Sequence, residues 1–130
     1  MTAETNKPSA RKWWKWFDPR AREAGTLAFI LNRVTALGLT FYLFLHLYVL
    51  GKLAQGPNAY DDFLATIRNP VFIFGELLVV IASIYHGLNG IRIAFATFWN
   101  AAPQQKQYFW ITLAIAVLIS LVFAIRMFTA

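Results

Sequence analysis

The chain has 130 residues, of which 58% are hydrophobic and 14% are charged, and it contains two histidines and no cysteine. An ordinary soluble domain is excluded, because about a quarter of the residues in such domains are charged. The lack of cysteine excludes disulfides, cysteine-type zinc sites and Cys-ligated iron–sulfur clusters. The net charge is +6, and half of the twelve lysines and arginines lie before residue 25, beside tryptophans, which favours a membrane surface over nucleic acid as the partner.

The N-terminal residues 1–25 are polar and basic, and residues 11–17 mix lysine and arginine with tryptophan and phenylalanine. Amphipathic rings next to cations are typical of a segment that lies at the membrane interface. The apolar stretch that follows is too long for the hydrophobic region of a signal peptide, so we expect this segment to be retained. We predict one membrane-anchor domain over residues 1–130, with residues 1–25 as its interfacial segment.

Three apolar stretches follow, at about residues 26–50, 71–99 and 108–125. At about 1.5 Å per residue, such helices cross or nearly cross the hydrocarbon core of roughly 30 Å. Between the first two stretches, Gly56-Pro57 precedes an amphipathic run at residues 58–67, which predicts a short surface helix. The sequence therefore predicts an all-α membrane protein with three transmembrane helices in a bundle.

The basic residues indicate how the chain crosses the membrane. Seven of them lie on the side of the N-terminus and the second connection: Lys7, Arg11, Lys12, Lys15, Arg20, Arg22 and Lys106. Three lie on the opposite side: Lys52, Arg68 and Arg126. Because basic residues accumulate on the cytoplasmic side, we predict a multi-pass protein with a cytoplasmic N-terminus.

His86 is one of the few ionisable side chains within an apolar stretch, where such residues are costly and often functional. At 100° per residue, its helix face carries mostly small residues, among them Gly75, Ala82, Ser83 and Gly90. Small residues let a flat haem lie against the backbone, but they also let two helices pack closely. Two interpretations therefore stay open, an axial haem ligand and a hydrogen-bonded histidine at a helix interface.

His46 lies on the first apolar stretch, and its depth can be compared with that of His86. His46 lies 13 residues after Arg33, about 20 Å along a helix, and His86 lies 6 residues before Arg92, about 9 Å. If both arginines mark the same interface, the histidines differ in depth by about 10 Å. A single shared iron is disfavoured, and each histidine would need a partner ligand from another subunit.

Arg33 and Arg92 have two possible roles. They could be positively charged anchors on the cytoplasmic side. They could also pair with haem propionates or donate hydrogen bonds to a quinone carbonyl, since an arginine supplies charge and several fixed donors.

Two segments resemble a known family. Residues 31–36 and 42–46 resemble the opening of the first helix in the cytochrome b membrane anchor subunit of succinate dehydrogenase (complex II). His86, followed by Asn89-Gly90-Ile91-Arg92, resembles the family's His-x-x-x-Gly-Ile-Arg signature on its second helix. The likeness covers residues 26 to 125, with Asn32 where the family has histidine.

The resemblance implies a haem b-binding, non-catalytic anchor that carries part of the haem and quinone sites of a tricarboxylic acid cycle enzyme. It implies a flavoprotein subunit, an iron–sulfur subunit and a second small anchor that completes the bundle. His86 and His46 would be axial ligands of two haems shared with that second anchor. Arg33, Arg92 and Asn32 would lie at the propionates or at the quinone, either menaquinone or ubiquinone.

We therefore expect an electron-transport subunit in the cytoplasmic (inner) membrane of a prokaryote, in contact with lipid and quinone. It would support electron transfer from iron–sulfur clusters to quinone. Two alternatives remain open. One is a haem-binding anchor of another quinone oxidoreductase, and the other is a structural membrane subunit without a cofactor.

Overall fold

The computed structural model describes residues 24–99 and 102–129, and within these ranges the chain is helical apart from short turns. The elements in chain order are α1 (Ala24–Ala54), α2 (Pro57–Ile67), α3 (Pro70–Phe98), the 3-10 helix η3 (Ala102–Gln104) and α4 (Gln105–Thr129). Of the interfacial segment predicted for residues 1–25, all but the first two residues of α1 lie outside the described residues.

Helices α1, α3 and α4 are long and apolar enough to cross a membrane, with 31, 29 and 25 residues. This confirms the prediction of an all-α protein with three membrane-spanning helices. The helices extend beyond two of the apolar stretches, because α1 continues through Lys52 to Ala54 and α4 already begins at Gln105. Polar residues at these ends propagate a helix well but lie outside the apolar window from which the spans were predicted.

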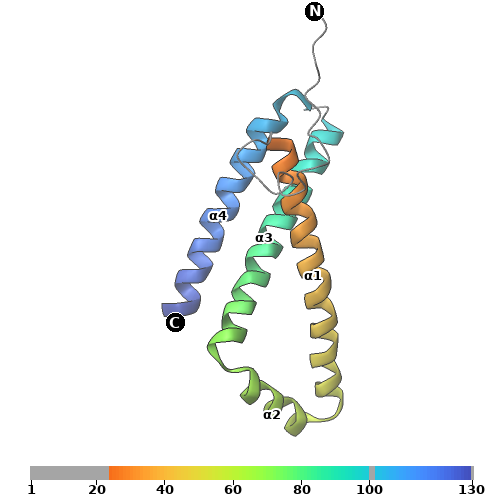
Figure 1. The fold of residues 1–130 in the computed structure, drawn as a ribbon, viewed down its shortest axis with the longest axis vertical. Coiled ribbons are helices and arrows are strands. Elements are labelled where there is room, and N and C mark those ends of the chain that lie inside the picture. The colour runs from red at the N-terminus through yellow and green to blue at the C-terminus, as the bar shows by residue number, and fades with distance from the viewer. Residues whose placement is uncertain (1–23, 100–101, 130) are drawn as a thin grey trace, which may run out of the picture.

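The predicted surface helix between the first two spans is α2. It begins at Pro57, whose fixed φ suits the first turn, after Gly56 with a φ of 116° that favours glycine. Helix α3 begins after Asn69, whose Oδ1 accepts hydrogen bonds from the backbone N–H groups of Val71 (3.1 Å) and Phe72 (3.3 Å). Figure 1 shows α2 joining the ends of α1 and α3.

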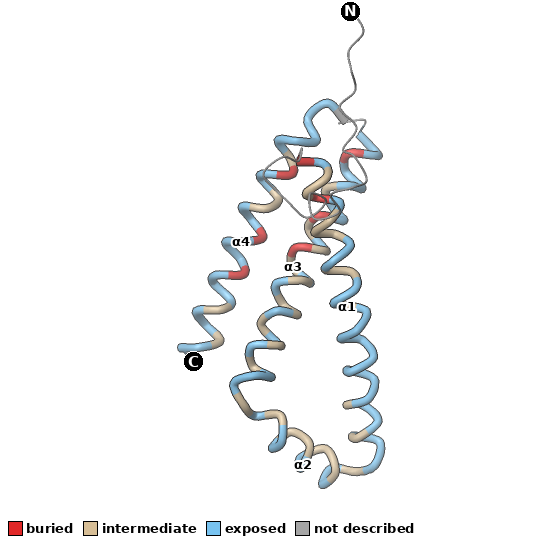
Figure 2. Tube along the Cα trace, viewed as in Figure 1, coloured by how far each residue is buried: buried red, intermediate tan, exposed pale blue. Residues whose placement is uncertain are grey.

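The helices pack closely at the end where α1 begins, α3 ends and α4 begins, with α3 against both neighbours (Figures 1 and 2). The buried cluster lies there and consists of Ala24, Ala28, Tyr85, Phe109 and Ala116. The small alanines let the backbones approach, as in other membrane helix pairs.

Toward α2, α1 and α3 lie apart, and residues 41–48 of α1 are all exposed (Figure 2). Apolar side chains facing outward are expected where lipid or another subunit is the neighbour. The exposed apolar side chains in this half of α1 fit a membrane-spanning helix.

Candidate functional site

A buried amide lies at the centre of the packed end. The side chain of Asn89 is only 1% exposed. Its Nδ2 donates to Oδ1 of Asn32 (3.0 Å), which links α3 to α1, and its Oδ1 accepts from Nε of Arg92 (3.0 Å). An amide inside an apolar span needs such partners, because an unpaired polar group there is costly.

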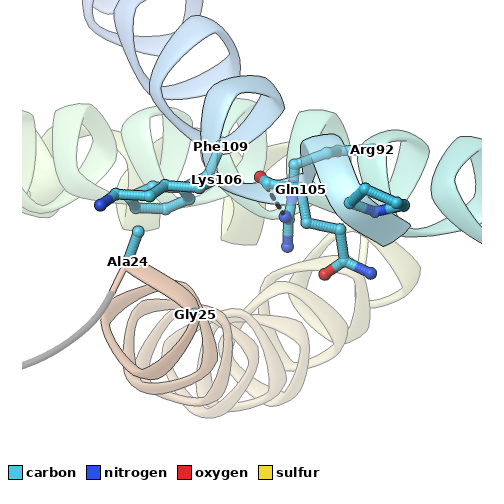
Figure 3. A pocket seen from close by; sticks show the side chains of 7 residues that line it. Ala24, Gly25, Arg92, Gln105, Lys106 and Phe109 are labelled. Carbon is cyan, nitrogen blue, oxygen red and sulfur yellow. Dashed lines mark hydrogen bonds between the residues drawn. The ribbon is translucent and has the colours of Figure 1, made fainter. Parts of the chain in front are cut away.

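Arg92 extends this network to the third span. Its Nη1 donates to the backbone carbonyl of Gln105 at 3.4 Å, drawn as a dashed line in Figure 3, and its guanidinium lies 5.8 Å from the ring centroid of Phe109. The chain from Asn32 through Asn89 and Arg92 to Gln105 therefore connects α1, α3 and the start of α4. Among the described residues, no buried side-chain nitrogen or oxygen lacks a hydrogen-bond partner.

His86 lies beside α1, one helical turn from Asn89. Its Nδ1 is 3.2 Å from the hydroxyl oxygen of Thr35. From the Asn32–Asn89 pair to the Thr35–His86 pair, the chain advances three residues on α1 and goes back three on α3. Two antiparallel helices require this register, so both contacts belong to one row of polar side chains between α1 and α3, the α1–α3 seam.

The other side of His86 is open. The imidazole is half-buried, while Ser83, Gly87 and Gly90 on the same helix are exposed. A Cβ atom added at Gly87 or Gly90 would meet no described atom within 4 Å apart from the adjacent backbone of α3 itself. The ring thus lies at the edge of the α1–α3 seam, with Nδ1 engaged and Nε2 as the nitrogen available to a ligand.

His46 is not brought to the same place. It is exposed on α1, and its ring centroid lies 5.8 Å from that of Tyr42. It follows Thr35 by 11 residues, which is about 16 Å along the helix, while His86 lies level with Thr35. The separation exceeds the 10 Å expected from the sequence, because that estimate assumed that Arg33 and Arg92 start at the same depth.

The three residues expected at the propionates or the quinone divide into two groups. Asn32 and Arg92 are joined through Asn89, so part of their hydrogen-bonding capacity is used inside the bundle. Arg33 is exposed, and its guanidinium lies 4.9 Å from the ring centroid of Phe29, one turn earlier on α1. Arg33 therefore keeps donors for a partner beyond this helix.

A cavity of about 400 Å³ lies at the same end of the bundle, between the starts of α1 and α4 and the end of α3 (Figure 3). It is lined by Ala24, Gly25, Arg92, Pro103, Gln105, Lys106 and Phe109. Two of these residues are cationic, so the cavity suits an anionic or strongly hydrogen-bonding group. Of the predicted site residues, it contains Arg92 alone.

Asn89 and Thr35 contribute to this site, but they were not predicted as site residues from the sequence. Asn89 was noted as a neighbour of His86, and its polar amide in an apolar span was the signal for a buried hydrogen bond. Thr35 gave a weaker signal, because threonine in a membrane helix usually bonds to its own backbone. The spacing of Asn32 and Thr35 matches that of Asn89 and His86, and this shared three-residue step was the only sequence indication of their pairing.

The fold and the site define a small multi-pass helical membrane protein, with a polar seam between its first two spans and a histidine at the edge of that seam. The family model described as succinate dehydrogenase/fumarate reductase transmembrane subunit matches residues 4–123. The chain belongs to this family, which confirms the resemblance seen in the sequence.

Three relatives illustrate the match. The chain is 31% identical over 90 residues to succinate dehydrogenase 2 membrane subunit SdhC of Mycobacterium tuberculosis, covering 68% of this chain and 66% of the relative. It is 28% identical over 93 residues to the succinate dehydrogenase hydrophobic membrane anchor subunit of Halobacterium salinarum, covering 71% and 72%. It is 29% identical over 94 residues to a fumarate reductase subunit of Photobacterium profundum, covering 72% and 63%. The chain thus spans slightly less than two thirds of the first and third relatives.

Proposed function

We propose that the chain is the haem b-binding membrane anchor of a succinate:quinone oxidoreductase. The observation that carries the haem assignment is the position of His86, half-buried with Nδ1 held by Thr35 and with an open helix face of small residues beside it. An imidazole that binds iron through one nitrogen commonly donates its other N–H to an oxygen.

The residues present fit one axial position of a haem. The chain's other histidine, His46, lies about 16 Å away along α1, so a second imidazole for the same iron would come from another subunit. A bound haem supplies a one-electron carrier within the membrane. The chain's own contribution is to fix the imidazole, exclude water through its apolar spans and place donors near the propionates.

His46 is the proposed ligand of a second haem. It lies about 16 Å along α1 from the level of His86, so the two histidines cannot bind one iron from opposite faces. Its exposed position on the unpacked half of α1 leaves it accessible to a partner subunit. This proposal predicts two haems at two depths.

The quinone or the propionates would meet Arg33, Arg92 and Asn32. Arg33 has the greatest freedom to bind an outside group, because it is exposed and its guanidinium lies over the Phe29 ring of its own helix, with no hydrogen bond to another described residue. Arg92 still has the donors of Nη2, since Nε and Nη1 are used within the bundle. Arg33 is thus the better candidate for direct contact with quinone.

The partners would be a flavoprotein subunit, an iron–sulfur subunit and a second small anchor. The exposed apolar faces of α1 and the fit of only one ligand at His86 support a second membrane subunit. Relatives from Mycobacterium tuberculosis, Halobacterium salinarum and Photobacterium profundum support the cytoplasmic membrane of a prokaryote as the location. The excess of basic residues on the side of the N-terminus supports a cytoplasmic N-terminus.

The test is affinity purification of the tagged chain from its native membrane in mild detergent. We expect flavin and iron–sulfur clusters to co-purify, together with succinate-dependent quinone reduction. Co-purification of a different catalytic subunit would favour another quinone oxidoreductase instead. An untagged preparation carried through the same steps is the control.

A cofactor-free structural subunit is the second candidate. The hydrogen bond between Thr35 and His86 favours it, because that contact would also satisfy a histidine whose only role is to join two helices. This alternative predicts a colourless preparation, and it predicts that His86→Ala leaves quinone reduction unchanged.

A further inference from the structure

We propose that Thr35 is a positioning residue for haem, which accepts a hydrogen bond from Nδ1–H of His86 and so presents Nε2 to the iron. The inference rests on the proposed haem-binding role of His86. It adds a residue of α1 to a site whose ligand is on α3, and it assigns the tautomer of that ligand.

The hydrogen-bond distances decide which group donates. A threonine hydroxyl has one hydrogen and two lone pairs. The hydroxyl of Thr35 lies 2.8 Å from the carbonyl oxygen of Leu31 and 3.1 Å from that of Asn32, and both oxygens can only accept. Its hydrogen therefore points to its own helix, and a lone pair is left for the imidazole at 3.2 Å.

The opposite arrangement would be incompatible with iron binding. If Thr35 donated to Nδ1, the neutral imidazole would carry its hydrogen on Nε2, which is the nitrogen on the side away from Thr35. That nitrogen could not then coordinate the iron. The contacts of Thr35 with its own backbone thus select the one tautomer in which Nε2 has a free lone pair.

Thr35 is held firmly enough to orient another side chain. It is half-buried, it is β-branched and its hydroxyl is bonded to the preceding turn. The Asn32–Asn89 hydrogen bond fixes α1 against α3 one turn away. The oxygen that meets His86 therefore belongs to a rigid element, which suits a group that orients a metal ligand.

The test compares three variants of the intact, detergent-purified complex. Thr35→Val keeps the shape and removes the acceptor, whereas Thr35→Ser keeps the hydroxyl. Thr40→Val is the matched control, because Thr40 lies on the same helix, is exposed and donates to the carbonyl of Ala36 at 2.8 Å. The readouts are the midpoint potential and the electron paramagnetic resonance spectrum of the haem bound through His86.

We expect Thr35→Val to raise the potential and to shift the spectrum, because an imidazole without its acceptor is less basic and stabilises ferric iron less. A tenfold loss of preference for ferric iron corresponds to about 59 mV in a one-electron couple. Retention of haem after dilution should fall by about 10- to 100-fold. Thr35→Ser and Thr40→Val should have the midpoint potential, spectrum and haem retention of the wild type.

The outcomes separate this inference from the proposed function. A wild-type complex without haem would overturn both. Haem in the wild type with an unchanged potential and spectrum in Thr35→Val would overturn the role of Thr35 alone. If Thr35→Val fails to assemble, Thr35→Ala replaces it. Loss of haem in Thr35→Ala, together with full haem in Thr35→Ser, would then support the inference. The same loss in Thr40→Val would contradict it.

Discussion

Replacing Asn89 with leucine tests whether the buried polar network holds the spans together. The variant keeps a similar side-chain size but loses the bonds to Asn32 and to Arg92, both 3.0 Å long. An interhelical hydrogen bond in a membrane contributes about 0.6 kcal/mol on average, and one to a charged group contributes about 1.5–3 kcal/mol. We therefore expect Asn89→Leu to lower the free energy of unfolding by roughly 2–3.5 kcal/mol.

The assay is unfolding of the purified chain in mixed micelles of increasing sodium dodecyl sulfate, followed by circular dichroism. Ser83→Ala is the control on the same helix, because Ser83 is exposed and its hydroxyl donates to the carbonyl of Val79 in its own helix. A double-mutant cycle with Asn32→Leu should show a coupling free energy above about 0.5 kcal/mol. If Asn89→Leu were no more destabilising than Ser83→Ala, the network would have no stabilising role.

Three further predictions concern the connections and the topology. Gly56→Ala should lower the free energy of unfolding by about 1–3 kcal/mol in thermal unfolding, because a φ of 116° is strained for alanine. Gly51→Ala within α1 is the control and should not lower the free energy of unfolding. Asn69→Ala should cost about 1 kcal/mol and speed amide hydrogen exchange in the first turn of α3, and Asn69→Asp should restore both. Asn58 follows the first span and Lys106 follows the second, so the two positions should lie on opposite sides of the membrane. Single cysteines introduced at these positions of the cysteine-free chain should react with an impermeant thiol reagent from opposite sides of sealed vesicles. Labelling of both from the same side would contradict three spans.

Length and hydropathy were sufficient to predict the helices. The three spans follow from apolar stretches that no soluble fold accommodates, and α2 follows from an amphipathic run between breakers. The exact helix ends were less predictable. Residues such as Lys52 and Gln105 fit a helix as well as a loop, and their place was decided by the continuation of backbone hydrogen bonding beyond the apolar core.

Contacts between helices could be predicted only in part. The sequence indicated that His86 and His46 lie at different depths, and the structure places them further apart than estimated. The pairing of Thr35 with His86 depends on the register of α1 against α3, which no local pattern determines. Once Asn32 is opposite Asn89, that register places Thr35 beside the histidine.

The hydrogen bonds of Asn32 and Arg92 could not be predicted from the sequence. Asn32 and Arg92 were expected to face a cofactor or quinone, and the structure shows both in hydrogen bonds with Asn89. These hydrogen bonds depend on how the helices pack, which a sequence motif does not specify.

The most direct test of the central claim is the amount of haem b per flavin, measured by the pyridine haemochrome assay on the detergent-purified complex and on its His86→Ala and His46→Ala variants. We predict two haems in the wild type and one in each variant, because the histidines lie about 16 Å apart along α1 and would bind separate irons. A wild-type complex without haem, or a His86→Ala variant with its full haem content, would contradict the proposal that this anchor binds haem through His86.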